Sequence, residues 1–195
     1  MIEDDFQYWG NKITRYIGEN GLYGYLSLEG KEITEAVFQN ASIFQDGVAM
    51  VSMNDGMIYY IDTSGKRITR DYLDGHPYEN QGSYARVKLE DGTWGIINRQ
   101  DKIVFEGADY IEELPTVTTL GCAIVNEQAV LFCLDSMETE EVSVIRTYED
   151  FCDISVYLGE FGIVTNKDDL LSIYETGSGK IKVRGKVEIE KAKGG

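Results

Sequence analysis

The strongest constraint on the fold is a segment that recurs, with changes, about every 35 residues. Its clearest copy spans 91–98, where an Asp-Gly turn precedes the short apolar strand Trp94-Gly95-Ile96-Ile97 and the polar residue Asn98 ends it. Related segments occupy 20–27 and 55–62. Recurrence at such an interval is typical of repeat proteins, in which each unit is a small supersecondary structure that packs on its neighbours. The sequence therefore constrains the architecture more than it constrains the chemistry.

An apolar residue followed by a polar residue marks the same point in five successive units. These pairs are Leu26-Ser27, Ile61-Asp62, Ile97-Asn98, Leu134-Asp135 and Tyr174-Glu175, at steps of 35, 36, 37 and 40 residues. A turn that contains Gly-Lys or Asp-Lys follows four of the five pairs. Each unit then ends in a strand that a glycine opens, and turns such as Asn54-Asp55-Gly56 are strong hairpin signals. We therefore expect the repeat to run from about residue 12 to residue 175.

The segments between these turns favour strands. Tyr, Ile, Val, Phe and Thr fill them, and 21 glycines punctuate them. Only 137–148 has a spacing that a helix would tolerate, and its alternation of Val142 and Val144 fits a strand as well. The tail alternates apolar and charged residues, which predicts two short strands around Arg184-Gly185. We predict an all-β fold: an array of about five antiparallel β-repeat units of roughly 35–40 residues, either propeller-like or an open β-superhelix.

Unit by unit, this pattern resembles the WG-repeat family, also called KWG repeats. Units of that family combine a Trp-Gly strand, a Gly-Lys turn and a strand with an aromatic-acid-Gly-apolar pattern. Residues 93–98 match the first part, Ser64-Gly65-Lys66 match the second and 44–51 match the third. Only Trp94-Gly95 keeps the defining dipeptide in phase, and Tyr23-Gly24 is a near form. The resemblance implies an all-β array over most of the chain.

A unit of this length cannot bury both faces of its strands, so neighbouring units must share a core. Five aromatic residues are expected to fill the layers between units: Tyr23, Tyr25, Tyr60, Trp94 and Phe132. The chain as a whole is expected to form a single repeat domain over 1–195. Within it, 1–19 would supply an N-terminal cap and the first strand, 20–176 the WG-like repeats, and 177–195 C-terminal strands and a basic tail.

The charge of the chain is acidic and unevenly distributed. It has 34 acidic and 18 basic residues, a net charge of −16. Between residues 101 and 160 there are 14 acidic and two basic residues, whereas 180–195 has six basic and two acidic ones. Such a field repels nucleic acid and anionic membranes and favours basic partners. The plain alternative is that the charge serves solubility alone.

The expected location is the cytoplasm. The three cysteines, Cys122, Cys133 and Cys152, are an odd number without Cys-x-x-Cys spacing, which favours a reduced chain with buried thiols. The sequence has no apolar run near the roughly 18 residues that a membrane span needs, and it starts with acidic residues instead of the basic start of a secretory signal.

No catalytic constellation stands out, so we expect a protein that is not an enzyme and that needs no cofactor or metal. His76 is the only histidine, and nothing in the sequence places a nucleophile near it, so a plain surface residue is expected. Carboxylate pairs are too abundant to indicate a glycosidase, and Asn54-Asp55-Gly56 and Asp168-Asp169 are better interpreted as turns than as metal ligands. The glycines follow the repeat and form no phosphate-binding loop.

The units that follow Asn98 depart most from the repeat and collect most of the acids, which predicts a partner-binding face within 109–160. Its candidate residues are Glu112, Glu113, Asp135, Glu138, Glu140, Glu141, Glu149, Asp150 and Asp153. The expected function is non-enzymatic binding of a basic protein, and a specific version is an immunity-type inhibitor that masks a basic toxin or nuclease. Three alternatives stay open: a carbohydrate or small-ligand module that uses exposed aromatic residues, a scaffold repeat, and a solvated surface without a partner.

Overall fold

The computed structural model describes the backbone of residues 12–114, 120–134, 142–148, 151–156, 161–166, 170–175 and 181–186. The chain divides into two compact units, Met1–Gly107 and Ala108–Gly195. The single repeat domain expected over residues 1–195 stays a prediction.

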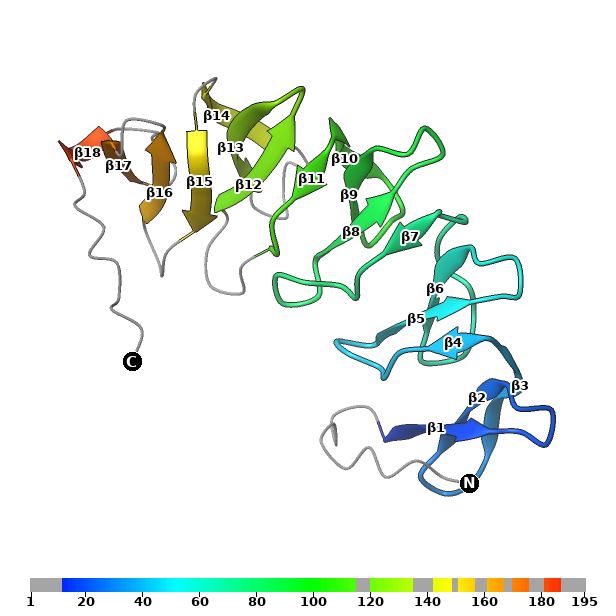
Figure 1. Cartoon of the computed structure of the whole chain (residues 1–195). Helices are drawn as coiled ribbons and strands as arrows, with labels where there is room; N and C mark the ends of the chain where they lie inside the picture. The colour runs from blue at the N-terminus through cyan, green and yellow to red at the C-terminus, as the bar shows by residue number, and fades with distance from the viewer. Residues whose placement is uncertain are drawn as a thin grey trace, which may run out of the picture. The chain divides into compact units, whose positions relative to one another are not determined.

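The first unit contains three antiparallel sheets in chain order (Figure 1). The first sheet consists of β1 (Ile13–Ile17), β2 (Tyr23–Ser27) and β3 (Glu32–Phe38). The second has β4 (Asn40–Ala41), β5 (Val48–Ser52) and β6 (Ile58–Asp62). The third has β7 (Asp74–Gly75), β8 (Tyr84–Lys88), β9 (Trp94–Asn98) and β10 (Ile103–Ala108).

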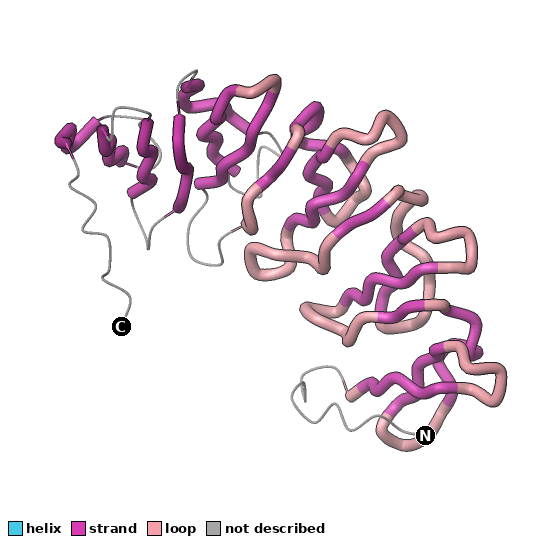
Figure 2. The backbone as a smooth tube through the Cα atoms, in the orientation of Figure 1, coloured by secondary structure: helices cyan, strands magenta, loops and turns pink. Residues whose placement is uncertain are grey.

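The second unit contains two sheets of four antiparallel strands. One has β11 (Tyr110–Ile111), β12 (Leu120–Val125), β13 (Gln128–Leu134) and β14 (Val142–Tyr148). The other has β15 (Phe151–Val156), β16 (Phe161–Asn166), β17 (Leu170–Glu175) and β18 (Ile181–Lys186). The described part of the chain has strands and loops and no helix (Figure 2), which confirms the all-β prediction. One detail of that prediction was wrong: β18 runs through Arg184 and Gly185, because Gly185 pairs with Leu171 of β17 and continues the ladder.

The boundaries between the sheets differ from the boundaries between the repeat units defined from the sequence. That definition placed 47–51 and 55–62 in successive units, yet β5 and β6 are neighbours in one sheet. The reason is the short turn at 53–57, which lets Ser52 pair directly with Ile58. The same connection joins β8 to β9, where Lys88 pairs with Trp94. Each of these sheets therefore contains the last strand of one sequence-defined unit and the first strand of the next.

These hairpins share one local hydrogen bond. In three successive sheets, the side-chain oxygen Oδ1 of Asn20, Asp55 or Asp91 accepts a bond from the backbone N–H two residues later, at 3.1, 3.0 and 2.9 Å. The glycine that follows each of them has a φ of 77°, 80° or 84°, a conformation that glycine adopts without steric cost. An Asx-Gly pair thus supplies both the side-chain acceptor and the positive φ that these turns need.

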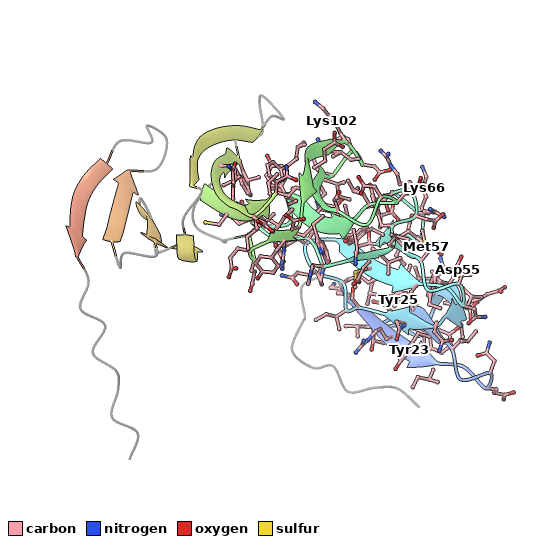
Figure 3. All side chains as sticks on the ribbon, turned by 45° about the horizontal axis from the view of Figure 1, so that its top comes forward. Tyr23, Tyr25, Asp55, Met57, Lys66 and Lys102 are labelled. Carbon is pink, nitrogen blue, oxygen red and sulfur yellow. The ribbon has the colours of Figure 1, made fainter. Side chains whose placement is uncertain are left out.

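The polar residue that ends the next strand also closes a turn. Ser27 Oγ, Asp62 Oδ1 and Asn98 Oδ1 accept a bond from the backbone N–H of the lysine four residues later, at 3.3, 3.1 and 3.0 Å. The side-chain hydrogen bond from Ser64 lowers the pKa of the Asp62 carboxyl. This favours the ionised carboxylate, which is the form that accepts the hydrogen bonds of the turn. Lys66 and Lys102 of these turns are exposed and mark them in Figure 3.

One repeat position holds a fully buried side chain in three successive sheets. Tyr25, Tyr60 and Ile96 occupy it, directly before Leu26, Ile61 and Ile97, and all three are 0% exposed. Phe132 of β13 is also 0% exposed. The two tyrosine hydroxyls donate to carbonyl oxygens of the following segment, Tyr25 to Ser42 and Tyr60 to His76, each at 2.5 Å. Burying a tyrosine is favourable only when its hydroxyl finds a partner, and these bonds supply it.

The same two tyrosines contact aromatic rings edge to face. The Tyr25 and Phe44 ring centroids are 4.8 Å apart, and those of Tyr60 and Tyr78 are 5.1 Å apart. The core predicted from aromatic residues is thus confirmed for Tyr25, Tyr60 and Phe132. Tyr23 is partly buried and packs against the core cluster that contains Tyr25. The prediction was wrong for Trp94, which is only partly buried because it lies at the start of its strand, beside an exposed turn.

Trp94 and Gly95 have separate structural roles. A Cβ on Gly95 would lie 2.9 Å from the carbonyl oxygen of Phe105 in the neighbouring strand, so only glycine fits there. The Trp94 ring stacks on the His76 ring at a centroid distance of 5.3 Å and an interplanar angle of 33°. His76 is partly buried and its carbonyl accepts the Tyr60 hydroxyl, so the expectation of a plain surface histidine was wrong.

Candidate binding face

Three of the nine acidic residues expected to bind a partner fall within the described backbone. Glu112 and Glu113 follow β11 directly. Glu112 donates its N–H to the Cys122 carbonyl at 2.9 Å and its Oε2 accepts the Tyr110 hydroxyl at 3.0 Å, whereas Glu113 is exposed. Asp153 lies in β15 opposite Thr165. Glu112 and Glu113 lie side by side because they are adjacent in the sequence, so their proximity does not test the predicted face.

The other six predicted residues lie outside the described part of the chain: Asp135, Glu138, Glu140, Glu141, Glu149 and Asp150. Their placement relative to Glu112 and Glu113 is thus not tested. The acidic face stays a prediction that depends on the charge of the sequence.

The first unit has a hollow of about 460 Å³ that the sequence did not suggest. Its lining comes from β4, from β5 with the hairpin turn that follows it, from the start of β6 and from β7. Asp55 and Met57, labelled in Figure 3, mark this hairpin. The residues that line the hollow are Gln39, Asn40, Ala41, Ser42, Met50, Val51, Ser52, Met53, Asn54, Gly56, Ile58 and Asp74.

The polar groups of the hollow are held in fixed places. Asn40 Nδ2 donates to Ser52 Oγ at 3.0 Å, and the two residues are opposite each other in the β4–β5 pair. Ser52 is only 5% exposed, so this bond satisfies a hydroxyl that is removed from water. Asp74 is exposed, and its Oδ1 accepts the N–H of Gly75 at 2.8 Å.

The apolar groups form the inner part of the lining. Ala41, Val51 and Ile58 are buried. Ala41 and Val51 belong to the core cluster that contains Tyr25, and Ile58 belongs to the one that contains Tyr60. Met53, which is 37% exposed, lies at the rim, and its sulfur accepts the Tyr59 hydroxyl at 3.7 Å. The hollow thus joins an apolar interior to a polar rim with one carboxylate, an arrangement typical of sites that bind small groups.

Sequence reasoning missed Asn40 and Asp74, although a signal for them exists. They hold the same position in successive repeats, since Asn40 is opposite Ser52 in β5 and Asp74 is opposite Lys88 in β8. The corresponding residue of the next sheet is Tyr110, opposite Ile124. A search for polar residues at one phase of the repeat would have found the first two, but it would not have shown that they share a hollow.

The five arginines of residues 12–114 serve the structure of the first unit. Arg86 forms a partly buried ion pair with Glu79 at 2.6 Å, and Arg67 pairs with Asp71 at 2.8 Å. Arg70 pairs with Asp101 at 3.1 Å. Arg15 and Arg99 donate to the carbonyls of Ala41 and Asp46, each at 2.6 Å. Each of these five cations thus has a contact within the first unit.

Reactive and metal-binding groups are sparse in the described residues. They contain no cluster of three His, Cys, Asp or Glu side chains that could hold a metal ion. Cys122 is 0% exposed, and burial raises the pKa of its thiol to about 12, which makes it a poor nucleophile. No helix long and apolar enough to cross a membrane occurs in the described residues.

Comparison with known families gives a match over one period of the repeat. Residues 23–56 match the family described as WG containing repeat. This stretch is a WG repeat. It begins at β2 and ends in the β5–β6 turn, one period of the chain, and the resemblance inferred from the sequence is confirmed there. The Ser27 turn and the buried Tyr25 of this WG repeat recur 35 residues later at Asp62 and Tyr60, and its Asp55 turn recurs at Asp91.

Solved structures similar to the chain include propellers. The WD40 beta propeller domain of Doa1 has 14% identity and a TM-score of 0.37, covering 90% of this chain and 65% of that one. BamB from Moraxella catarrhalis has 14% identity and a TM-score of 0.38, covering 90% of this chain and 58% of that one. Apo AztD from Citrobacter koseri has 16% identity and a TM-score of 0.44, covering 91% of this chain and 57% of that one.

This chain therefore spans less than two thirds of the length of these structures. All three TM-scores lie below 0.5, and no feature of these proteins is carried over to this chain. A comparison with curated proteins finds no significant match.

Proposed function

We propose that the protein is a non-enzymatic interaction module that binds a basic protein partner. The WG repeat and the all-β repeat fold fit a protein-binding or scaffold role. The observation that carries the basic partner is the charge of residues 101–160, with 14 acidic residues against two basic ones. A specific version of the proposal is an immunity-type inhibitor in the cytoplasm, which masks the cationic site of a toxin or nuclease.

The proposed mechanism is electrostatic steering followed by occlusion. Carboxylates of one sign attract a basic protein over several ångströms and raise the association rate, and they contribute less to the dissociation rate. Because salt screens exposed charges over about 10 Å at 0.1 M, association would slow as ionic strength rises. Glu138, Glu140 and Glu141 form the densest acidic group in this part of the sequence and are the first residues to test.

The experiment compares two variants of equal net charge. One reverses Glu138, Glu140 and Glu141 to lysine, and the control reverses the exposed Glu19, Glu35 and Glu90 of the first unit to lysine. Each full-length protein is used to capture partners from native lysate, and the association rate of a captured basic protein is then measured at two salt concentrations. We expect the first variant to lose the partner and the control to keep it. Equal binding by both variants would contradict the proposed face.

Carbohydrate binding has no specific support in the described residues. Protein sites for sugars commonly stack an aromatic ring against the sugar face, whereas the residues that line the hollow of the first unit include no Tyr, Trp or Phe.

A further inference from the structure

We propose that the hollow of the first unit binds an arginine side chain of a basic polypeptide. Among the residues that line the hollow, Asp74 is the one charged residue, and none is Lys, Arg or His. A volume of about 460 Å³ lies within the range of about 300–1,000 Å³ that is usual for ligand sites. The hollow is therefore large enough for a side chain, and its one charged lining residue is negative, as binding of a cationic group requires.

The polar rim fits a guanidinium in particular. The Asp74 carboxylate is exposed and lines the hollow, and its Oδ1 accepts the N–H of Gly75, so its negative charge is available to a cationic ligand. Asn40 uses its amide N–H on Ser52, which leaves its carbonyl oxygen as an acceptor. A guanidinium presents several N–H donors in a planar fork and binds a carboxylate with two bonds, whereas an ammonium binds as a point charge.

The apolar lining fits the rest of the side chain. An arginine keeps its charged head in water or on a polar partner while its methylene stem lies along apolar surface. Met50, Met53 and Ile58 provide that surface in the hollow. Methionine is unbranched and polarizable, and it adapts to a ligand at little cost. A basic side chain thus has contacts along its whole length.

Lys88 is the cross-strand neighbour of Asp74. It lies directly opposite Asp74 in the β7–β8 pair, where Cβ atoms are about 4.5–5.5 Å apart. A positive charge on the residue opposite Asp74 lowers the negative potential that Asp74 presents to an incoming cation. Replacing Lys88 by methionine should therefore strengthen arginine binding, while replacing Asp74 by asparagine should weaken it.

This inference shares the cationic class of partner with the proposed function, but it rests on the first unit alone. The acidic residues expected to bind a partner begin at Glu112, in the second unit. A short peptide reaches the hollow without the second unit, so the two proposals fail independently.

The test titrates the full-length protein with acetyl-Gly-Arg-Gly-amide and follows backbone amide shifts by NMR. The control ligand is the same peptide with citrulline, which keeps the shape and removes the charge. We expect saturable shifts around Asn40, Ser52 and Asp74 with a weak affinity, on the order of 1 mM, as suits one exposed ion pair. Citrulline should bind at least about threefold more weakly.

Four variants make the result decisive. Asp74→Asn should weaken binding by about threefold to fivefold, and Lys88→Met should strengthen it by a similar factor. Asp91→Asn removes the same charge from an exposed turn and should leave binding unchanged, as should the triple reversal at Glu138, Glu140 and Glu141. The inference is overturned if citrulline binds as well as arginine, if a lysine peptide binds as tightly, or if Asp74→Asn and Asp91→Asn have equal effects.

Discussion

Asp101 occupies the repeat position that glycine holds in the two preceding units. Its φ is 61°, beside 80° at Gly30 and Gly65, so a residue with a Cβ has been placed in the left-handed region. The Asp101 side chain compensates for that cost. Its Oδ1 accepts the Tyr72 hydroxyl at 2.5 Å, and its Oδ2 accepts the Arg70 backbone N–H at 2.9 Å and the guanidinium at 3.1 Å. The exchange of glycine for aspartate thus fastens the segment before β7 to the β9–β10 turn.

Replacing Asp101 should separate these two contributions. Asp101→Ala keeps the unfavourable φ and removes the bonds, so we expect a loss of about 2–4 kcal/mol in the free energy of unfolding. Asp101→Gly removes the same bonds but adopts the φ freely, so its loss should be smaller by about 1 kcal/mol. Urea denaturation measures both values. Equal losses would mean that backbone strain at this residue is negligible.

The Cys122 thiol should be unreactive in the folded protein. Burial raises its pKa to about 12, and the negative charge of Glu112 adds to this effect, so almost no thiolate exists at pH 8. In a variant with Cys133 and Cys152 replaced by serine, a disulfide reagent should modify the single thiol quickly in 8 M urea. In buffer the rate should fall at least about a hundredfold. Rapid modification in buffer would show that the thiol is accessible.

At the scale of the element, each hairpin depends on glycines of two kinds. Gly56 has a positive φ in open space, since an added Cβ would meet no atom within 4 Å. Gly95 lies within β9, where an added Cβ would approach the Phe105 carbonyl oxygen in β10 to 2.9 Å. The first glycine is needed for its backbone freedom and the second for the close approach of two strands.

This difference predicts unequal effects of substitution. Gly95→Ala forces β9 and β10 apart, and we expect it to lower the free energy of unfolding by about 2–3 kcal/mol. Gly56→Asn should cost less than about 1 kcal/mol, because asparagine tolerates the left-handed region in a turn. Thermal unfolding of both variants, followed by circular dichroism, checks the order. A larger loss for Gly56→Asn than for Gly95→Ala would mean that the turn glycine matters more to stability than the close approach of β9 and β10.

At the scale of the whole molecule, buried tyrosines couple stability to alkaline pH. Burial raises the pKa values of Tyr25, Tyr60, Tyr72 and Tyr78 above their ordinary value, with the Asp101 hydrogen bond adding to the effect at Tyr72. In the unfolded chain these hydroxyls titrate near pH 10. The folded protein therefore keeps protons that the unfolded chain releases above that pH.

The sign of the linkage follows from this difference. The contribution of the four tyrosines is fully present below about pH 10 and decreases as pH rises above it, since only the unfolded chain gains charge there. We expect the free energy of unfolding to fall steadily between pH 10 and pH 12, with tyrosinate absorbance from these residues appearing together with unfolding. Tyr25→Phe should be less stable at pH 8 and show a shallower decline. An unchanged slope in that variant would contradict the assignment.

The sequence by itself determined the local architecture of this protein. The Asx-Gly pairs and the polar residue at the end of each strand are turn instructions that act within four residues, so Asp55, Asp62 and Asp91 form their hydrogen bonds where the pattern predicted turns. The period of about 35 residues and the buried position of Tyr25 and Tyr60 are readable for the same reason. Each depends on the residue itself and its nearest neighbours.

Only the tertiary structure decided which distant side chains meet. Asp101 contacts Arg70 and Tyr72 from about 30 residues away, and Asn40 shares a hollow with Asp74 from the next sheet. A repeat pattern gives each of these residues a place in its own unit, but it contains no information on how far one sheet rotates or shifts against the next. That packing is set by the shape of all the side chains between the sheets, and it created the hollow of the first unit.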